Sequence, residues 1–190
     1  MRMRLCALVA VVAGALCVAA AQTEAPARSP GTPAKQQSDN AKAAPVLLVT
    51  TPQAMQTDVD PALEHIEVTF DRPMRDKSWS WTGGGDTYPQ TTGKPSYDAQ
   101  RTTCTLPVKL VPGKVYWVGI NSPSHRNFVS EDGEPSPWYI LLFSTRSADG
   151  KPTPLPPDRV REAKKINAAY EKALGFVPNA KGKASTRDAR

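Results

Sequence analysis

The stretch covering residues 110–121 constrains the fold of this chain more than any other part of the sequence. Pro112 and Gly113 form a turn that ends one strand, and apolar side chains alternate along the chain from Val115 as in a second strand. Tyr116 follows Gly113 by three residues, so its hydroxyl can fold back onto the backbone of the turn, as in the tyrosine corner of Greek-key sandwiches. This stretch predicts a β-sandwich and identifies no chemical activity.

Other short alternating runs predict the rest of an all-β domain over residues 45–147. Strands are expected at 46–50, 64–70, 78–82, 102–110, 115–121 and 138–145. An Asp132-Gly133 turn between the last two strands is a hairpin signal. The expected core consists of Val59, Ile66, Val68, Phe70, Leu106, Val108, Tyr116, Val118, Ile120 and Phe143. Six or seven strands with no helix between them predict a Greek-key sandwich.

The N-terminus predicts export to the periplasm or the medium. Arg2 and Arg4 precede an apolar run of about 17 residues that ends in three alanines, which is the pattern of a secretory signal peptide over residues 1–21. An uncleaved anchor is the alternative, although the small residues at the end of the run favour cleavage. Leu16 stands before Cys17 and argues against a lipid anchor there, and no later segment is apolar enough to span a membrane.

Three segments flank the predicted domain. Residues 22–44 are rich in Pro, Ala and Ser and predict a disordered linker; residues 148–157 form a Pro-rich hinge, and the basic residues 176–190 a disordered tail. Residues 158–175 predict an amphipathic helix with Asp158 as its N-cap. Its apolar stripe contains Val160, Ala163, Ile166, Tyr170, Ala173 and Leu174, and its other face carries Arg159, Lys164, Lys165 and Lys172. The helix either docks on the domain or binds a partner or membrane surface.

Charge and cysteine content narrow the class of protein. Cleavage of the signal peptide removes Arg2 and Arg4, and the net charge then falls from +6 to about +4, too small an excess to indicate nucleic-acid binding. Two of the three cysteines leave with the signal peptide, so no disulfide within the chain is possible. Cys104 shares a strand face with Leu106 and Val108 and is expected to be a buried, inert thiol.

Several motifs together resemble a known family. Thr51-Pro52-Gln53-Ala54, Thr57-Asp58-Val59-Asp60-Pro61, Val68-Thr69-Phe70-Asp71-Arg72-Pro73-Met74, Leu110-Val111-Pro112-Gly113-Lys114-Val115-Tyr116 and Phe143-Ser144-Thr145 occur in this order. Over about residues 45–146 the chain resembles the bacterial Ig-like domain of the SbsA S-layer type. The resemblance implies a seven-stranded sandwich that serves exported bacterial proteins as a spacer, surface or binding module, without family-wide catalytic residues. Residues 79–95 are longer than the usual spacing of that family.

The apolar residues left over from the core predict a covered surface. Trp117, Trp138, Ile140 and Leu142 fall on the outer face of the last two strands, and such a patch marks a binding site or a covered surface. Two segments can cover it: residues 78–94, with Trp79, Trp81 and Tyr88, or the C-terminal helix. Tryptophans left open to solvent would favour stacking on sugar rings, whereas burial would remove that platform.

No set of residues predicts catalysis, a cofactor or a metal. The motifs of serine hydrolases, zinc proteases and phosphate-binding loops are absent from the sequence. His125 lies in a polar loop, and Asp58, Asp60, Glu131, Asp132 and Glu134 fit turns better than a calcium site. Two hypotheses remain. The first is a non-enzymatic structural or interaction module that contacts an envelope protein or surface polymer. The second is a carbohydrate-binding module that uses Trp79, Trp81, Trp117 or Trp138.

Overall fold

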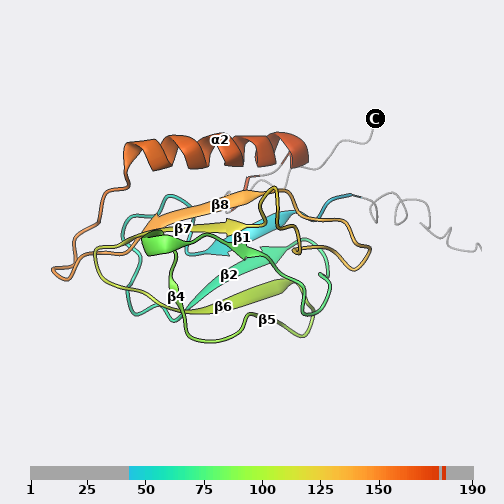
Figure 1. The fold of residues 1–190 in the computed structure, drawn as a ribbon, viewed down its shortest axis with the longest axis horizontal. Helices are drawn as coiled ribbons and strands as arrows, with labels where there is room; N and C mark the ends of the chain where they lie inside the picture. The colour runs from blue at the N-terminus through green and yellow to red at the C-terminus, as the bar shows by residue number, and fades with distance from the viewer. Residues whose placement is uncertain (1–42, 176, 179–190) are drawn as a thin grey trace, which may run out of the picture. The chain divides into compact units, whose positions relative to one another are not determined.

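The computed structural model describes residues 43–175, 177 and 178. Every described residue belongs to one compact unit of the chain. The signal peptide, nearly all of the linker and nearly all of the basic tail therefore lie outside the described residues. The described part contains two antiparallel sheets and one long helix, which confirms the all-β sandwich with a C-terminal helix (Figure 1).

The first sheet has the order β1-β2-β6-β4, and β5 also pairs with β6. Its strands are β1 (Leu47–Thr51), β2 (His65–Phe70), β4 (Gln90–Thr91), β5 (Ser96–Tyr97) and β6 (Thr103–Lys109). The second sheet has the order β3-β7-β8, with β3 (Trp81–Thr82), β7 (Val115–Ile120) and β8 (Tyr139–Ser144). A 3-10 turn, η1 (Gly85–Thr87), lies beside β7.

The core forms between the two sheets from the side chains that the alternation predicted. Ile66, Val68 and Phe70 of β2 are buried, and their neighbours on the opposite face are not. The hydroxyl of Tyr116 accepts a hydrogen bond from the Val111 backbone N–H at 2.8 Å, so the tyrosine corner is confirmed. Its ring stacks on Phe143 with centroids 5.2 Å apart. The Pro-Gly turn is thereby fastened to the core.

The Asp132-Gly133 turn forms, but it does not join β7 to β8 directly. The Ser130 N–H donates to the Glu134 carbonyl at 2.9 Å, and Gly133 takes a positive φ of 90°. The turn closes a small bridge between Val129 and Pro135 inside the long connection from β7 to β8. Register between β7 and β8 therefore comes from their own side chains rather than from a two-residue hairpin loop.

After β1 the chain crosses to the second sheet and pairs with β8. The Met55 N–H donates to the Leu142 carbonyl at 2.6 Å, and the Ser144 N–H donates to the Gln56 carbonyl at 2.9 Å. Val59 and Thr145 then form a parallel bridge. This segment covers the outer edge of β8 from Leu142 onward.

Helix α2 (Pro157–Leu174) begins one residue earlier than predicted, and Asp158 is not its N-cap. Pro156 takes the N-cap position without a side-chain cap, and Asp158 lies in the first turn. Pro157 suits the first helical position because the φ of a proline is already helical and no N–H is needed there. Gly175 ends the helix in the left-handed region with φ 64°, and its N–H donates to the Glu171 carbonyl at 2.7 Å.

α2 lies along the outer face of β8 and runs antiparallel to it (Figure 1), so the helix is the segment that covers this face. Ala163 packs on Ile140 and Leu142, which are fully buried, and Val160 and Ile166 extend the contact. Full burial of an Ile or Leu side chain such as Ile140 or Leu142 contributes about 1.5–3 kcal/mol. The structure thus favours a docked helix over a free one. Residues 78–94, the other candidate, do not cover this face. Ala173, predicted in the stripe, is exposed.

Asn167 of α2 pairs with the edge of β8. Its Oδ1 accepts from the Ile140 N–H at 2.8 Å, and its Nδ2 donates to the Ile140 carbonyl at 2.9 Å. Both backbone groups face away from β7, at the part of the edge that precedes the contact with Met55. One amide side chain therefore completes the pairing of a strand edge that would otherwise be buried without partners.

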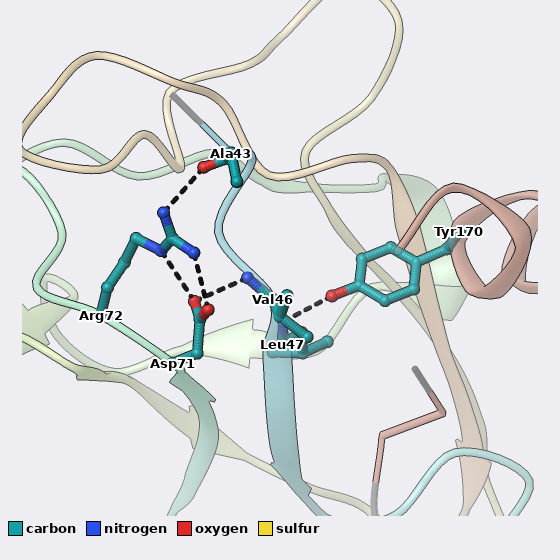
Figure 2. A network of polar contacts seen from close by, with 6 residues as sticks. All are labelled: Ala43, Val46, Leu47, Asp71, Arg72 and Tyr170. Atoms are coloured by element: carbon teal, nitrogen blue, oxygen red, sulfur yellow. Dashed lines mark hydrogen bonds and ion pairs between the residues drawn. The ribbon is translucent and has the colours of Figure 1, made fainter. Parts of the chain in front are cut away.

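The Tyr170 side chain reaches from α2 into the core between the two sheets. Its side chain and that of Leu174 belong to the inter-sheet core, and its hydroxyl accepts a hydrogen bond from the Leu47 N–H at the start of β1 (Figure 2). Beside this contact Asp71 accepts from the Val46 N–H at 2.8 Å. Arg72 holds Asp71 and donates to the Ala43 carbonyl at 2.8 Å. The point where the chain enters the domain is therefore tied to the end of α2.

The Pro-rich segment 148–157 is attached to the sandwich along its length. The Thr153 N–H donates to the Thr57 carbonyl at 2.9 Å, and its carbonyl accepts from the Ser144 hydroxyl at 2.5 Å. Leu155 packs with the side chains beneath α2. These contacts hold the start of the helix in place over β8.

Candidate binding site

A pocket of about 400 Å³ lies between the insertion that contains β3 and β4 and the loop that follows β7. Its apolar wall is made by Trp79, Trp81 and Tyr88, and polar side chains at its rim come from Lys94, His125 and Asn127. Leu106 of β6 contributes from the first sheet. The pocket therefore opens at a side of the sandwich where both sheets and an insertion meet.

Trp79 and Trp81 reach the pocket because they are anchored in the core beside it. Trp81 pairs with Ile120 of β7 and packs edge-on against Phe128, with ring centroids 5.3 Å apart. The Trp79 ring packs at 6.2 Å against Tyr97 of β5. Both indoles are half-buried, so one part of each ring supports the core and another part lines the pocket.

Hydrogen bonds of ordinary length fasten the rim to this wall. The Ser78 hydroxyl donates to the Asn127 carbonyl at 2.7 Å, and the Asn127 N–H donates to the Ser80 hydroxyl oxygen at 3.0 Å. The Tyr97 hydroxyl donates to the Ser78 carbonyl at 2.8 Å. Because these bonds use only the backbone of Asn127, its position is fixed while its side chain stays exposed.

Gly83 allows Tyr88 to close one side of the pocket. Its φ of 145° lies in a region that other residues rarely adopt. A Cβ at this position would lie 2.5 Å from Cδ2 of Tyr88 and 3.0 Å from the Trp117 carbonyl oxygen. Burial raises the pKa of the Tyr88 hydroxyl. Of the three consecutive glycines, the first is thus needed so that Tyr88 and the Trp117 carbonyl can lie close to the backbone.

The other two predicted binding tryptophans lie on the helix side of the molecule. Trp117 is half-buried beneath α2, and the Arg159 guanidinium carbon lies 5.4 Å from the centre of its ring. Trp138 borders a groove of about 480 Å³ along α2, with Ile166 and Ala169 opposite. The structure therefore brings Trp79 and Trp81 together and separates them from Trp117 and Trp138, whose shared face α2 covers.

The histidine loop adds no catalytic array to the pocket. His125 Nδ1 lies 3.0 Å from the Ser124 hydroxyl, and both residues are exposed. In residues 43–175, 177 and 178 no cluster of three or more His, Cys, Asp or Glu side chains is arranged to hold a metal ion. Asp60 instead accepts from the Ala62 N–H at 2.9 Å, which is turn chemistry as expected. None of the helices in the described part is long and apolar enough to cross a bilayer.

Cys104 lies within the core, as its strand face predicted. Its side chain is fully buried, and burial raises the pKa of the thiol to about 12. A thiol that stays protonated at neutral pH is a poor nucleophile. The described structure therefore favours an inert, packing role for this cysteine.

Sequence reasoning missed two buried amides and the residues of the pocket rim. Asn167 breaks an otherwise apolar helix stripe, and a polar residue at such a position was the available signal for a buried partner. Asn121, with φ 61°, donates to the carbonyls of Phe128 and Ser136 and accepts from the Phe128 N–H. It thereby holds the loop that carries His125 and Asn127. Nothing local in the sequence indicates these long-range partners.

Comparison with known proteins adds little to this description. No family model matches the chain, and no curated protein matches it. Among solved structures, that of the S-layer protein rSbsC(31-844) is similar over 58% of this chain and 15% of its own, at 20% sequence identity and a TM-score of 0.37. The chain thus spans a small part of that protein's length. The resemblance to the SbsA-type Ig-like domain continues to rest on the sequence motifs.

Proposed function

We propose that this chain is an exported, non-enzymatic Ig-like domain protein that serves as a structural or protein-interaction module of the cell envelope. Its partner is an envelope protein or a surface polymer, and it requires no cofactor. The leader-like N-terminus supports export, and the lack of known catalytic motifs in the sequence supports a binding role.

The observation that carries this proposal is the return of α2 to the entry point of the domain. α2 runs back along β8, and its Tyr170 contacts Leu47 at the start of β1. The chain therefore enters and leaves the domain at the same end (Figure 1). A spacer domain in a linear array has its N- and C-termini at opposite ends. Termini at the same end instead suit a module that is tethered at that end and presents its remaining surface to a partner.

The strand order supports the Ig-like assignment. The order β1-β2-β6-β4 facing β3-β7-β8 corresponds to the ABED and CFG sheets of constant-type immunoglobulin domains. Tyr116 at the start of β7 occupies the place of the tyrosine corner at the start of strand F. The carbohydrate-binding alternative is supported at Trp79 and Trp81, which line an open pocket, and not at Trp117, which α2 covers.

Export and envelope binding are tested together in a bacterial host. The full chain is expressed, cells are fractionated, and the N-terminus of the product is determined by mass spectrometry. We expect a product that begins at Gln22, in the periplasm or medium, which cosediments with purified envelope fragments. A product that keeps Met1 in the cytoplasm, or one that never cosediments, contradicts the proposal.

A truncated chain that ends at Pro178 serves as the matched control. It lacks the basic residues 179–190 and keeps every residue that packs in the described structure. Cosedimentation that survives truncation and added salt is due to the folded module. Cosedimentation that is lost with the tail is charge attraction alone and counts against the module.

A further inference from the structure

We propose that the pocket bounded by Trp79, Trp81 and Tyr88 binds a pyranose ring of a surface polysaccharide. This inference rests on the proposed function, because it names the class of surface polymer that the module contacts. The pocket is separate from the helix side of the molecule, where Trp117 and Trp138 lie.

The size and lining of the pocket suit one sugar ring. Its volume of about 400 Å³ falls within the usual range for small-molecule sites, which is roughly 300–1,000 Å³. A pyranose presents C–H groups on its faces and hydroxyls around its edge. An indole wall packs against the faces, while polar groups at a rim meet the edge.

The rim provides the hydrogen-bonding groups that sugar hydroxyls require. The Asn127 amide offers both a donor and an acceptor, His125 offers a ring nitrogen beyond the one near Ser124, and Lys94 offers an ammonium group. All three side chains are exposed, so binding a ligand does not require pulling them from the core. Each hydroxyl can donate and accept, which matches this mixed set.

The site is built before a ligand arrives. Ser78 and Ser80 hold the backbone of Asn127, and the Tyr97 hydroxyl holds Ser78 in turn. Trp81 is fixed against Phe128. A wall and rim already held in position reduce the ordering that binding would otherwise require.

A proline-rich peptide is the competing occupant of an aromatic groove, and the geometry favours a sugar. Polyproline segments dock on aromatic rings and rely on ring N–H or O–H groups that reach the peptide carbonyls. The Trp81 Nε1 atom is buried, so of the two indoles in the wall only Trp79 has a ring N–H that a peptide carbonyl could reach. The polar groups available at the opening are instead those of Lys94, His125 and Asn127.

The test uses the four tryptophan indole N–H signals of the ¹⁵N-labelled exported chain, assigned with single Trp→Phe variants. The probes are glucose, galactose, mannose, N-acetylglucosamine and short oligosaccharides of each. We expect at least one probe to move the Trp79 and Trp81 signals along a saturating curve while those of Trp117 and Trp138 stay in place. The last two signals act as an internal control for folding and for bulk effects.

Variants of the rim side chains test the contacts to the ligand without removing the backbone hydrogen bonds that support the site. Asn127→Ala and His125→Ala remove exposed side chains and leave the backbone bonds intact, so both variants are expected to fold. Each should weaken sugar binding about fivefold to thirtyfold through a lost hydrogen bond. Lys164→Ala, on the exposed face of α2, is the matched control and should bind as the parent does.

Three outcomes overturn the proposal: no probe moves any indole signal, all four signals move equally, or a polyproline peptide moves the Trp79 and Trp81 signals where no sugar does. Envelope cosedimentation distinguishes the levels of failure. If it persists while every sugar fails, the partner is an envelope protein or another surface polymer, and only this inference is wrong. If both fail, the proposed function is wrong as well.

Discussion

The hydroxyl of Tyr170 near the end of α2 accepts a hydrogen bond from the backbone N–H of Leu47 at the start of β1, 123 positions earlier in the chain. This contact links the last element of the described domain to the first across the gap between the two sheets. Tyr139, whose ring packs edge-on against Tyr170 with centroids 5.2 Å apart, supports it from β8. The helix is therefore part of the sandwich core and not only a cover for one face.

Replacing Tyr170 with phenylalanine should lower the free energy of unfolding by about 1–3 kcal/mol. The ring remains in the core, but the buried Leu47 N–H loses its acceptor. Urea denaturation followed by tryptophan fluorescence measures the change. Tyr139→Phe is the control, because no hydrogen bond of its hydroxyl is found among the described residues. A loss as large in the control would show that the hydrogen bond to Leu47 is not the cause.

Asn167→Ala should lower the free energy of unfolding by about 2–4 kcal/mol, because it leaves two buried backbone groups of Ile140 without partners. The bared edge of β8 should also favour pairing between chains. Sedimentation velocity at increasing protein concentration would detect that association. Ala168→Asn places an amide on the exposed helix face, so it should cost at most about 0.7 kcal/mol in helix propensity and leave the chain monomeric. A monomeric, fully stable Asn167→Ala chain would contradict the role given to this amide.

Gly83→Ala should displace Tyr88 and close or distort the pocket, with a loss of about 1–3 kcal/mol from the strained backbone. The added Cβ would lie 2.5 Å from the Tyr88 ring at a φ of 145°. Gly84→Ala is a neighbouring control: its φ of 174° is ordinary extended backbone, and nothing lies within 4 Å of the added atom. Thermal unfolding and the Trp81 indole signal compare the two variants. Equal behaviour would mean that Gly83 is not required for the close approach.

Stability should fall as pH rises from about 9 towards 12. Burial raises the pKa of Cys104 from 9.0 to about 12 and that of Tyr139 from 10.0 to about 12. At a pH between the pKa of a group in the unfolded chain and its higher pKa in the folded chain, the unfolded chain is deprotonated while the folded chain keeps the proton. Ionisation therefore stabilises the unfolded state relative to the folded state. Urea midpoints measured across this range test the slope, which Cys104→Val should make shallower. An unchanged slope in the variant would show that Cys104 does not contribute.

The parts of the fold that depend on local spacing could be predicted from the sequence. Tyr116 lies five residues from its partner Val111, and the alternation along β2 assigns Ile66, Val68 and Phe70 to the core without knowledge of the second sheet. The apolar residues Ile140 and Leu142 left over on the outer face of β8 likewise required a cover. Local pattern could establish that need, although it could not decide which segment meets it.

The parts that depend on distant partners could not be predicted. The insertion with Trp79 and Trp81 was one of two candidates for the outer face of β8, yet its rings pack against Tyr97 and Phe128 at the inter-sheet core. Asn167 reads as an interruption of a helix stripe until Ile140 is placed beside it. Pairing of a side chain with a strand edge has no period in the sequence, so alternation and helical spacing cannot reveal it.

The chain enters and leaves the domain at the same end, and this arrangement has a mechanical consequence. A force that pulls the two tails apart acts first on the C-terminal turn of α2, where Leu174 and Tyr170 enter the core beside β1. The helix would then detach from β8 progressively, starting at its C-terminal end. Under tension the domain should therefore release its helix before the two sheets separate, and so lengthen in two steps.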